Sequence, residues 1–462
     1  MKKIIVFFAL ITIVINAFGQ NLGMKSIIKE ISGLGTKFDQ QIEVWNQDTL
    51  IVLSRAADGS HYDFYLIIEG NDTVRQAMLN PTDTIKDFKI FEDKIWFCGG
   101  ETESVGPPLG FFAYASLNDL FVNHRFHYYY TKPMTTVNKM EIYRHATTNK
   151  INIVGIGPEA PSVGSRDVLC YYDGYLDTMF FYADTNSYEI LDDIIIKRDT
   201  AQIPQTNNIY VIGRNPINNF GYIFVRKFNM FNLTSNTGGY YSIASNMSIR
   251  APYPLIADSL IAKYIALAGI MRTTTGISNV EMTVIFAIDI DANPFTIHQR
   301  RLYGNYPIGL ASIRDLMLYY PNNNSPNHSI LILEDNAPLT SLQPPSNSIR
   351  SLDIDLGVRF GYHLNSFFMP HWTFNSIAKS SGTKILLSGI RASNHNINIF
   401  KGDPTDIDST ICNNMLDEGL DMMDTVEFFS PLNSVDRLYH NGYSWEIESV
   451  HLDYKIINTI CE

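Results

Sequence analysis

The chain repeats one short pattern, an apolar run of four or five residues that stops on glycine. The pattern reads DKIWFCGG at 93–100, NKINIVGIG at 149–157, NIYVIGR at 208–214, KYIALAGI at 263–270 and TKILLSGI at 383–390. Related runs without glycine, IVLS and LILE, end at Ser54 and Glu334. A short apolar run of this kind is typical of a buried strand. A glycine at its end indicates that another segment of backbone passes close by.

The ends of these runs are spaced regularly along the chain. The seven positions lie 45 to 65 residues apart and are Ser54, Gly99, Gly155, Gly213, Gly269, Glu334 and Gly389. A spacing of this size, kept from Ser54 to Gly389, indicates an array of similar supersecondary units.

Each unit contains the signals of further strands. A short strand and a polar turn precede most of the runs, as in DFKI at 87–90 and DDIIIK at 192–197. A third strand follows, for example YDFYLII at 62–68, and then a weaker fourth such as TMFFYAD at 178–184. Only IIKEISGL near 27–34 suggests a helix. Repeated four-stranded units predict an all-β fold, a β-propeller with seven blades, and leave six or eight blades open. Tandem β-sandwiches are the alternative.

In one respect the blades resemble those of the kelch-like and related propellers. Both carry an apolar strand that closes on glycine, as in IYVIG at 209–213, and here Gly99 and Gly100 form a double glycine. The regular Tyr and Trp positions of kelch repeats are missing. The resemblance therefore implies the architecture and no named family.

The N-terminus has the features of a secretory signal peptide. Lys2 and Lys3 precede an apolar run from Ile4 to Ile15, and Ala17 and Gly19 are small residues suited to cleavage. We predict a signal peptide at 1–19 and one propeller domain at 20–462, with no transmembrane segment in the mature chain. A segment at about 410–462 is expected to return to the N-terminal strands and close the ring. The predicted location is the periplasm, the cell surface or the extracellular space.

Charge and cysteine content restrict the function further. The formal net charge is −12 and no cluster of Lys and Arg occurs, which argues against a nucleic-acid partner. Cys98 and Cys170 lie in apolar runs and are expected to be buried free thiols. Cys412 and Cys461 lie in polar C-terminal contexts, and we predict a disulfide between them. Two unrelated thiols are the alternative.

We find no sequence motif for catalysis, for a metal or for a cofactor. DIDANP at 289–294 begins like a calcium loop but has Pro294 where glycine is needed. His124 and His127 have no metal-binding partners nearby in the sequence. A nucleophile elbow and a phosphate-binding loop are also absent. We therefore expect no cofactor and no metal.

One tripeptide recurs more often than composition explains: Asp, then Ser or Thr, then an aliphatic residue, Met or Thr. It resembles the O-glycosylation acceptor sequence that one group of Gram-negative bacteria uses on exported proteins. The alternative is that Asp-Thr is favourable turn chemistry at strand entrances. The candidate acceptors are Thr49, Thr73, Thr84, Thr178, Thr200, Ser259, Ser409 and Thr425.

Charged residues recur just after the apolar runs, although charge is sparse elsewhere in the chain. If the strands are equivalent, the loops that follow them emerge at one end of the propeller. The residues expected to line that end are Arg55, Glu101, Glu159, Arg214, Arg272, Arg391 and His395. Arg and Glu side chains suit polar ligands that accept or donate paired hydrogen bonds. The sequence therefore favours a non-enzymatic propeller that binds a glycan or a protein. A carbohydrate-active hydrolase or lyase and a structural envelope protein are the alternatives.

Overall fold

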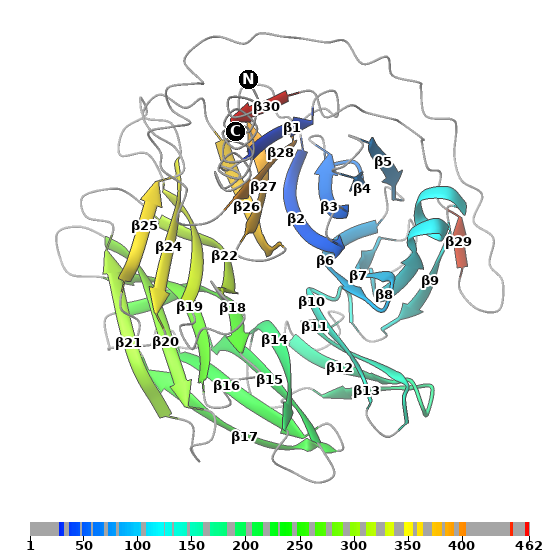
Figure 1. Ribbon diagram of the computed structural model, residues 1–462. Helices are drawn as coiled ribbons and strands as arrows, with labels where there is room; N and C mark the ends of the chain where they lie inside the picture. Colours follow the sequence, from blue (N-terminus) through cyan, green and yellow to red (C-terminus); the bar gives the residue numbers. More distant parts are fainter. Residues whose placement is uncertain are drawn as a thin grey trace, which may run out of the picture.

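The strands of the computed structural model form sheets arranged around a common centre (Figure 1). The structure describes the following parts of the chain: 27–31, 37–46, 49–56, 59–68, 73–79, 83–102, 108–123, 125–131, 134–145, 148–159, 167–182, 190–199, 206–215, 222–229, 232–242, 247–257, 264–273, 280–289, 296–304, 311–319, 329–336, 346–353, 358–363, 372–380, 384–391, 397–402, 444–446 and 458–461. These residues form seven sheets, five of four strands and two of five strands. The all-β propeller prediction is confirmed.

The first four sheets follow one another along the chain. Sheet 1 contains β2 (Lys37–Asn46), β3 (Thr49–Ala56), β4 (Tyr62–Ile68) and β5 (Thr73–Met78). Sheet 2 contains β6 (Asp83–Phe91), β7 (Lys94–Glu101), β8 (Leu109–Ser116), β9 (Arg125–Tyr130) and β29 (Ser444–Glu446), with the short π-helix η1 (Asp119–Asn123) between β8 and β9. Sheet 3 contains β10 (Lys139–Arg144), β11 (Ile151–Pro158), β12 (Asp167–Asp173) and β13 (Thr178–Tyr182). Sheet 4 contains β14 (Ile190–Asp199), β15 (Thr206–Asn215), β16 (Tyr222–Asn229) and β17 (Asn232–Ser242).

Three further sheets complete the arrangement. Sheet 5 contains β18 (Met247–Ala257), β19 (Tyr264–Thr273), β20 (Val280–Asp289) and β21 (Thr296–Gly304). Sheet 6 contains β22 (Ala311–Tyr319), β23 (Ser329–Asn336), β24 (Ser346–Asp353) and β25 (Val358–His363). Sheet 7 contains β26 (Trp372–Lys379), β27 (Ile385–Arg391), β28 (Ile397–Gly402), β1 (Ile27–Ile31) and β30 (Asn458–Cys461).

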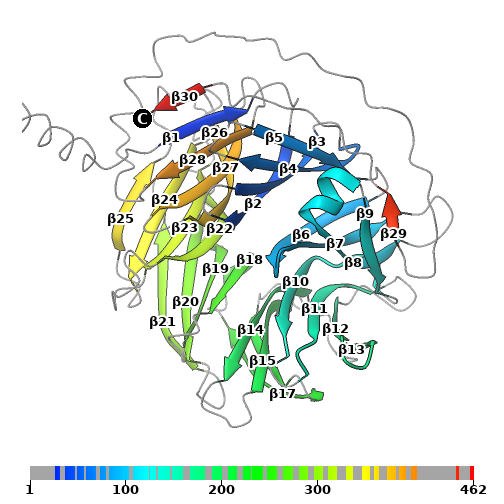
Figure 2. The ribbon, with the colours of Figure 1, turned by 45° about the vertical axis from the view of Figure 1, so that its right-hand side comes forward.

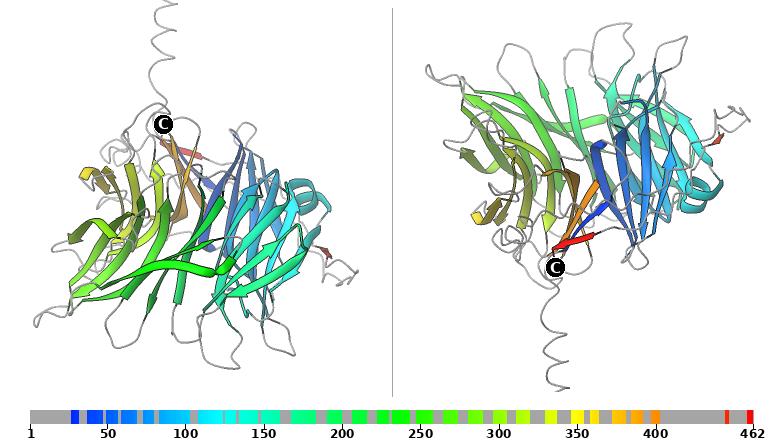
Figure 3. Two further views of the ribbon diagram at one scale, coloured as in Figure 1. Left: turned by 90° about the horizontal axis from the view of Figure 1, so that it is seen from below. Right: turned by 90° about the horizontal axis from the view of Figure 1, so that it is seen from above.

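The first strand of each sheet is the innermost. The seven inner strands β2, β6, β10, β14, β18, β22 and β26 contact one another in that order, and β26 contacts β2 again. They surround the centre of the ring in Figure 1. The N-terminal strand β1 and the C-terminal strand β30 both lie in sheet 7, where β1 pairs with β28 and with β30 (Figures 2 and 3). β1 is thus a strand, and the sequence-based suggestion of a helix near 27–34 is wrong for residues 27–31.

Sheets 1, 2 and 3 are covered on both faces by neighbouring sheets, which explains the continuous apolar runs in their strands. In β7, Trp96 and Cys98 pack against sheet 3, while Phe97 packs against sheet 1. Similar clusters join sheet 1 to sheet 7 and sheet 3 to sheet 4. Strands covered on both sides show no polar alternation. Cys98 and Cys170 are buried free cysteines, as predicted.

In six of the seven sheets, the residue that ends the run lies opposite or beside an irregularity in the inner strand. Gly99 pairs with Ile85, immediately before a bulge that leads to Asp87. The same register holds for Gly213, Gly269, Glu334 and Gly389, and Ser54 lies beside the bulge of β2. Sheet 3 is the exception, since Gly155 pairs with Met140 in a regular ladder. The last residue of an apolar run therefore usually marks a β-bulge in the neighbouring inner strand.

Candidate functional site

The predicted binding residues with a described backbone occupy equivalent places in the ring. Each lies at the C-terminal end of the second strand of its sheet, or just beyond it. The strands are β3 for Arg55, β7 for Glu101, β11 for Glu159, β15 for Arg214, β19 for Arg272 and β27 for Arg391. We call the loops that follow these second strands the loop face. The side chains of Arg214, Arg272 and Arg391, and all of His395, lie outside the described residues.

Three of these side chains are described, and their environments differ. The guanidinium of Arg55 lies 5.8 Å from the centre of the Tyr62 ring and next to Gly59, a glycine with φ of +70°. Glu101 is fully buried and accepts a hydrogen bond from the Tyr130 hydroxyl at 2.7 Å. Glu101 is therefore held inside sheet 2 rather than displayed on the surface. Glu159 is partly buried.

The segment 134–138, between sheets 2 and 3, contacts the ends of the strands that lead to Glu101 and Glu159. The backbone of Glu159 pairs with Met134, and Val137 N donates to Gly99 O at 2.9 Å. A Cβ atom on Gly157 would lie 2.1 Å from Thr136 O, so glycine is needed for this close contact. This segment thus joins the ends of β7 and β11 by backbone contacts.

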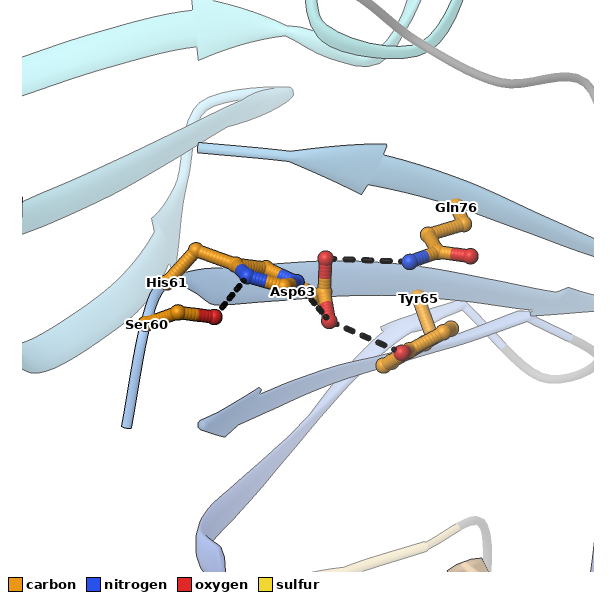
Figure 4. A network of polar contacts seen from close by, with 5 residues as sticks. All are labelled: Ser60, His61, Asp63, Tyr65 and Gln76. Atoms are coloured by element: carbon orange, nitrogen blue, oxygen red, sulfur yellow. Dashed lines mark hydrogen bonds and ion pairs between the residues drawn. The ribbon is translucent and has the colours of Figure 1, made fainter. Parts of the chain in front are cut away.

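A polar network follows β3, beside Arg55, and sequence inspection missed it (Figure 4). The hydroxyl of Ser60 lies 2.7 Å from His61 Nδ1, and His61 Nε2 lies 3.5 Å from Asp63 Oδ2. Asp63 is fully buried and also accepts hydrogen bonds from the Tyr65 hydroxyl and the Gln76 amide, both at 3.0 Å. Ser60 is exposed at the other end. A fixed carboxylate therefore orients a histidine that reaches an exposed hydroxyl.

Charged residues on the inner strands form a second cluster, near the axis of the ring. Lys89 Nζ on β6 lies 3.0 Å from Glu141 Oε1 on β10. Glu43 is partly buried, and this burial raises the pKa of its carboxyl to about 7, against the opposing effect of Lys89. The pKa of Lys89 is raised, first by the charge of Glu141. The carboxylates of Asp87 and Asp315 also act on Glu43, so acids outnumber bases here.

Polar side chains at the bulges connect neighbouring sheets. Asp87 Oδ2 accepts a hydrogen bond from Met140 N of sheet 3 at 3.1 Å. Asp315 Oδ2 likewise accepts from Ile377 N of sheet 7 at 2.9 Å. Ser376 Oγ accepts from Ile42 N of sheet 1 at 3.4 Å. These hydrogen bonds between sheets do have a signal in the sequence, because each of the three polar residues directly precedes an apolar residue of its inner strand.

The candidate glycosylation sites that are described lie at strand entrances. Thr49 and Thr73 begin β3 and β5, Thr84 is the second residue of β6, and Thr178 begins β13. Thr178 is exposed, whereas Thr49 and Thr84 are partly buried. Thr200, Ser259, Ser409 and Thr425 lie outside the described residues. Cys412 and the side chain of Cys461 also lie outside them, as do the predicted signal peptide and most of the C-terminal segment.

No group of three His, Cys, Asp or Glu side chains in the part of the chain that the structure describes could hold a metal ion. No helix among the described elements is long and apolar enough to cross a membrane.

The chain is similar to solved propeller structures at low sequence identity. One is the β-propeller domain of the Trilobed protease from Pyrococcus furiosus, with 9% identity over 79% of this chain and 92% of that one, at a TM-score of 0.42. Another is oligogalacturonate lyase from Vibrio parahaemolyticus, with 13% identity over 82% of this chain and 92% of that one, at a TM-score of 0.44. A third is Drosophila Semaphorin 1b, with 7% identity over 81% of this chain and 88% of that one, at a TM-score of 0.38. No family model and no curated protein matches the chain.

Proposed function

We propose that the chain is an exported seven-bladed propeller that binds a glycan or a protein through its loop face, without catalysis. Each sheet is taken as one blade, because each contributes one inner strand to the ring. The remaining strands of each sheet extend outward to the rim.

The observation that carries the proposal is the shared register of the charged residues. Arg55, Arg214, Arg272 and Arg391 each lie at one of the last two positions of a second strand, in sheets 1, 4, 5 and 7. Second strands of equivalent blades run in the same direction, so their ends meet at one end of a propeller. Guanidinium groups brought together there can bind carboxylates, phosphates or hydroxyl-rich ligands in paired geometry.

Replacing Arg214 and Arg272 with Ala tests this proposal. We expect the double variant to lose binding to the ligand that a glycan array or a pull-down identifies for the parent protein. Thermal stability should change little under this proposal, because an arginine that faces solvent to bind a ligand contributes at most about 0–1 kcal/mol through ion pairs. Circular dichroism melting provides the control for folding. Unchanged binding by a folded double variant would contradict the proposal.

The network of Ser60, His61 and Asp63 favours one competing function, a hydrolase that uses a histidine on the loop face. His61 could accept the proton of Ser60 as the hydroxyl attacks an ester or a similar carbonyl. A fluorophosphonate probe distinguishes the two functions, since it labels activated serines. Labelling of the parent protein that disappears in Ser60→Ala would favour the hydrolase. We expect no labelling, with the network serving to satisfy the buried Asp63 carboxylate.

A further inference from the structure

Exposed apolar side chains gather at one place on the rim of the ring. Among the described residues, four of the five large hydrophobic side chains that are exposed belong to the β12–β13 hairpin. Tyr175 and Leu176 at its tip are 65% and 56% exposed, and Phe180 and Phe181 in β13 are 41% and 39% exposed. The remaining one is Val122 in η1, at 43%. Such a concentration typically marks an interaction surface.

The tip of the hairpin is held in place by hydrogen bonds. Asp173 Oδ1 accepts from the backbone nitrogens of Tyr175 at 2.8 Å and Leu176 at 3.3 Å. Gly174 N donates to Asn152 Oδ1 at 3.1 Å. A Cβ atom on Gly174 would lie 2.1 Å from Ile151 O, so the turn is pressed against β11. The exposed side chains are thus presented from a rigid support, which lowers the entropy cost of binding.

Strand β13 is also an edge strand in the part of the chain that the structure describes. Among the described strands, β13 pairs only with β12 and lies at the rim (Figure 1). The equivalent strand of sheet 2, β9, is covered by β29, where Trp445 pairs with Phe126. In sheet 7, β28 is covered by β1, which β30 covers in turn. Two outer edges of this ring therefore carry an additional strand from a distant part of the sequence.

The composition of β13 indicates what kind of strand would pair with it. Its sequence TMFFY carries no charge, in a chain with a formal net charge of −12. Two copies of the chain repel each other because both carry a negative net charge. A strand without charged residues is a place where the two copies can come into contact with less repulsion. In an antiparallel pair of β13 with itself, Phe180 is the central residue and lies opposite its own copy, where aromatic pairs stabilise strands.

We propose that β13 pairs with β13 of a second copy of this chain and forms a symmetric dimer with a continuous sheet across the two rings. Tyr175, Leu176, Phe180 and Phe181 are the apolar contacts of this dimer. A five-residue strand edge is a small interface, so the affinity is expected to be micromolar. This surface lies on the rim and does not depend on the loop face.

Sedimentation velocity on the full chain across micromolar concentrations tests the proposal. The parent protein should reach twice the monomer mass. Leu176→Asp combined with Phe181→Asp should weaken the dimer about 30-fold or more, the effect of removing interface anchors. Val122→Asp is the matched control, an exposed apolar side chain outside the hairpin, and should dimerise like the parent. A monomeric parent, or open-ended aggregates in place of a dimer, would overturn the proposal.

A cross-linking experiment provides independent support. Phe180→Cys should form a disulfide-linked dimer under mild oxidation, because residues opposite each other in a sheet are within disulfide reach. Val122→Cys should not form one at the same rate. Equal cross-linking of the two variants would indicate random collision and would also overturn the proposal.

Discussion

At the scale of single residues, the glycines that end the apolar runs are explained by the backbone opposite them. A Cβ atom on Gly99 would lie 1.9 Å from Thr84 O, which is fixed in the inner strand. On Gly155 it would meet the ring of Phe112 at 2.5 Å. The two glycines look equivalent in the sequence, but the first faces backbone at a bulge and the second faces side chains in a regular ladder.

Gly99→Ala should therefore destabilise the protein more than Gly155→Ala. Overpacking of a core usually costs about 1–3 kcal/mol, and we expect Gly99→Ala at or above the top of that range because a backbone oxygen cannot turn away. Phe112 can shift in response to Gly155→Ala, so that variant should lie at the lower end. Chemical denaturation of the two variants measures the difference. Equal losses would contradict the bulge as the cause.

At the scale of elements, the sequence predicted the strands well and the contacts between sheets poorly. The runs ending at Gly99 and Gly213 fall in β7 and β15, and TMFFY at 178–182 is β13, as expected. Strand periodicity is a local signal, so it can be found without a structure. The hydrogen bond from Met140 N to Asp87 joins residues of different sheets, and the approach of such residues depends on packing. For the same reason, the burial of Glu101 could not be foreseen.

The bulge carboxylates should contribute to stability through these contacts. Asp87→Ala removes the acceptor of the buried Met140 N–H group. Leaving a buried donor unsatisfied costs about 1–3 kcal/mol, and we expect a loss of that size in chemical denaturation. Lys86→Ala, in the same strand with an exposed side chain, is the control and should cost little. A loss of stability no larger for Asp87→Ala than for this control would show that the contact between sheets 2 and 3 does not matter.

At the scale of the whole molecule, closing the ring brings charges from distant parts of the sequence together at the inner strands. Glu43 of sheet 1 lies among charges from sheets 2, 3 and 6, namely Lys89 and Asp87, Glu141, and Asp315. Its pKa is raised from 4.5 to about 7. Between these values the folded protein holds a proton that the unfolded chain releases. The stabilisation from Glu43 is therefore complete below pH 4.5 and is lost as pH rises through about 7.

Glu43→Gln, which resembles the protonated acid, should accordingly become more stable than the parent as pH rises from 5 to 8. Melting temperatures across this range measure the effect. Glu92→Gln is a control of opposite sign, because the guanidinium of Arg144 lowers the pKa of Glu92. The stabilisation from the ionised Glu92 is present above its ordinary pKa and is lost as pH falls through its lowered pKa. Glu92→Gln should therefore be less stable than the parent at neutral pH. If the melting temperature of Glu43→Gln instead differs from that of the parent by the same amount at every pH, the inner strands do not raise the pKa of Glu43.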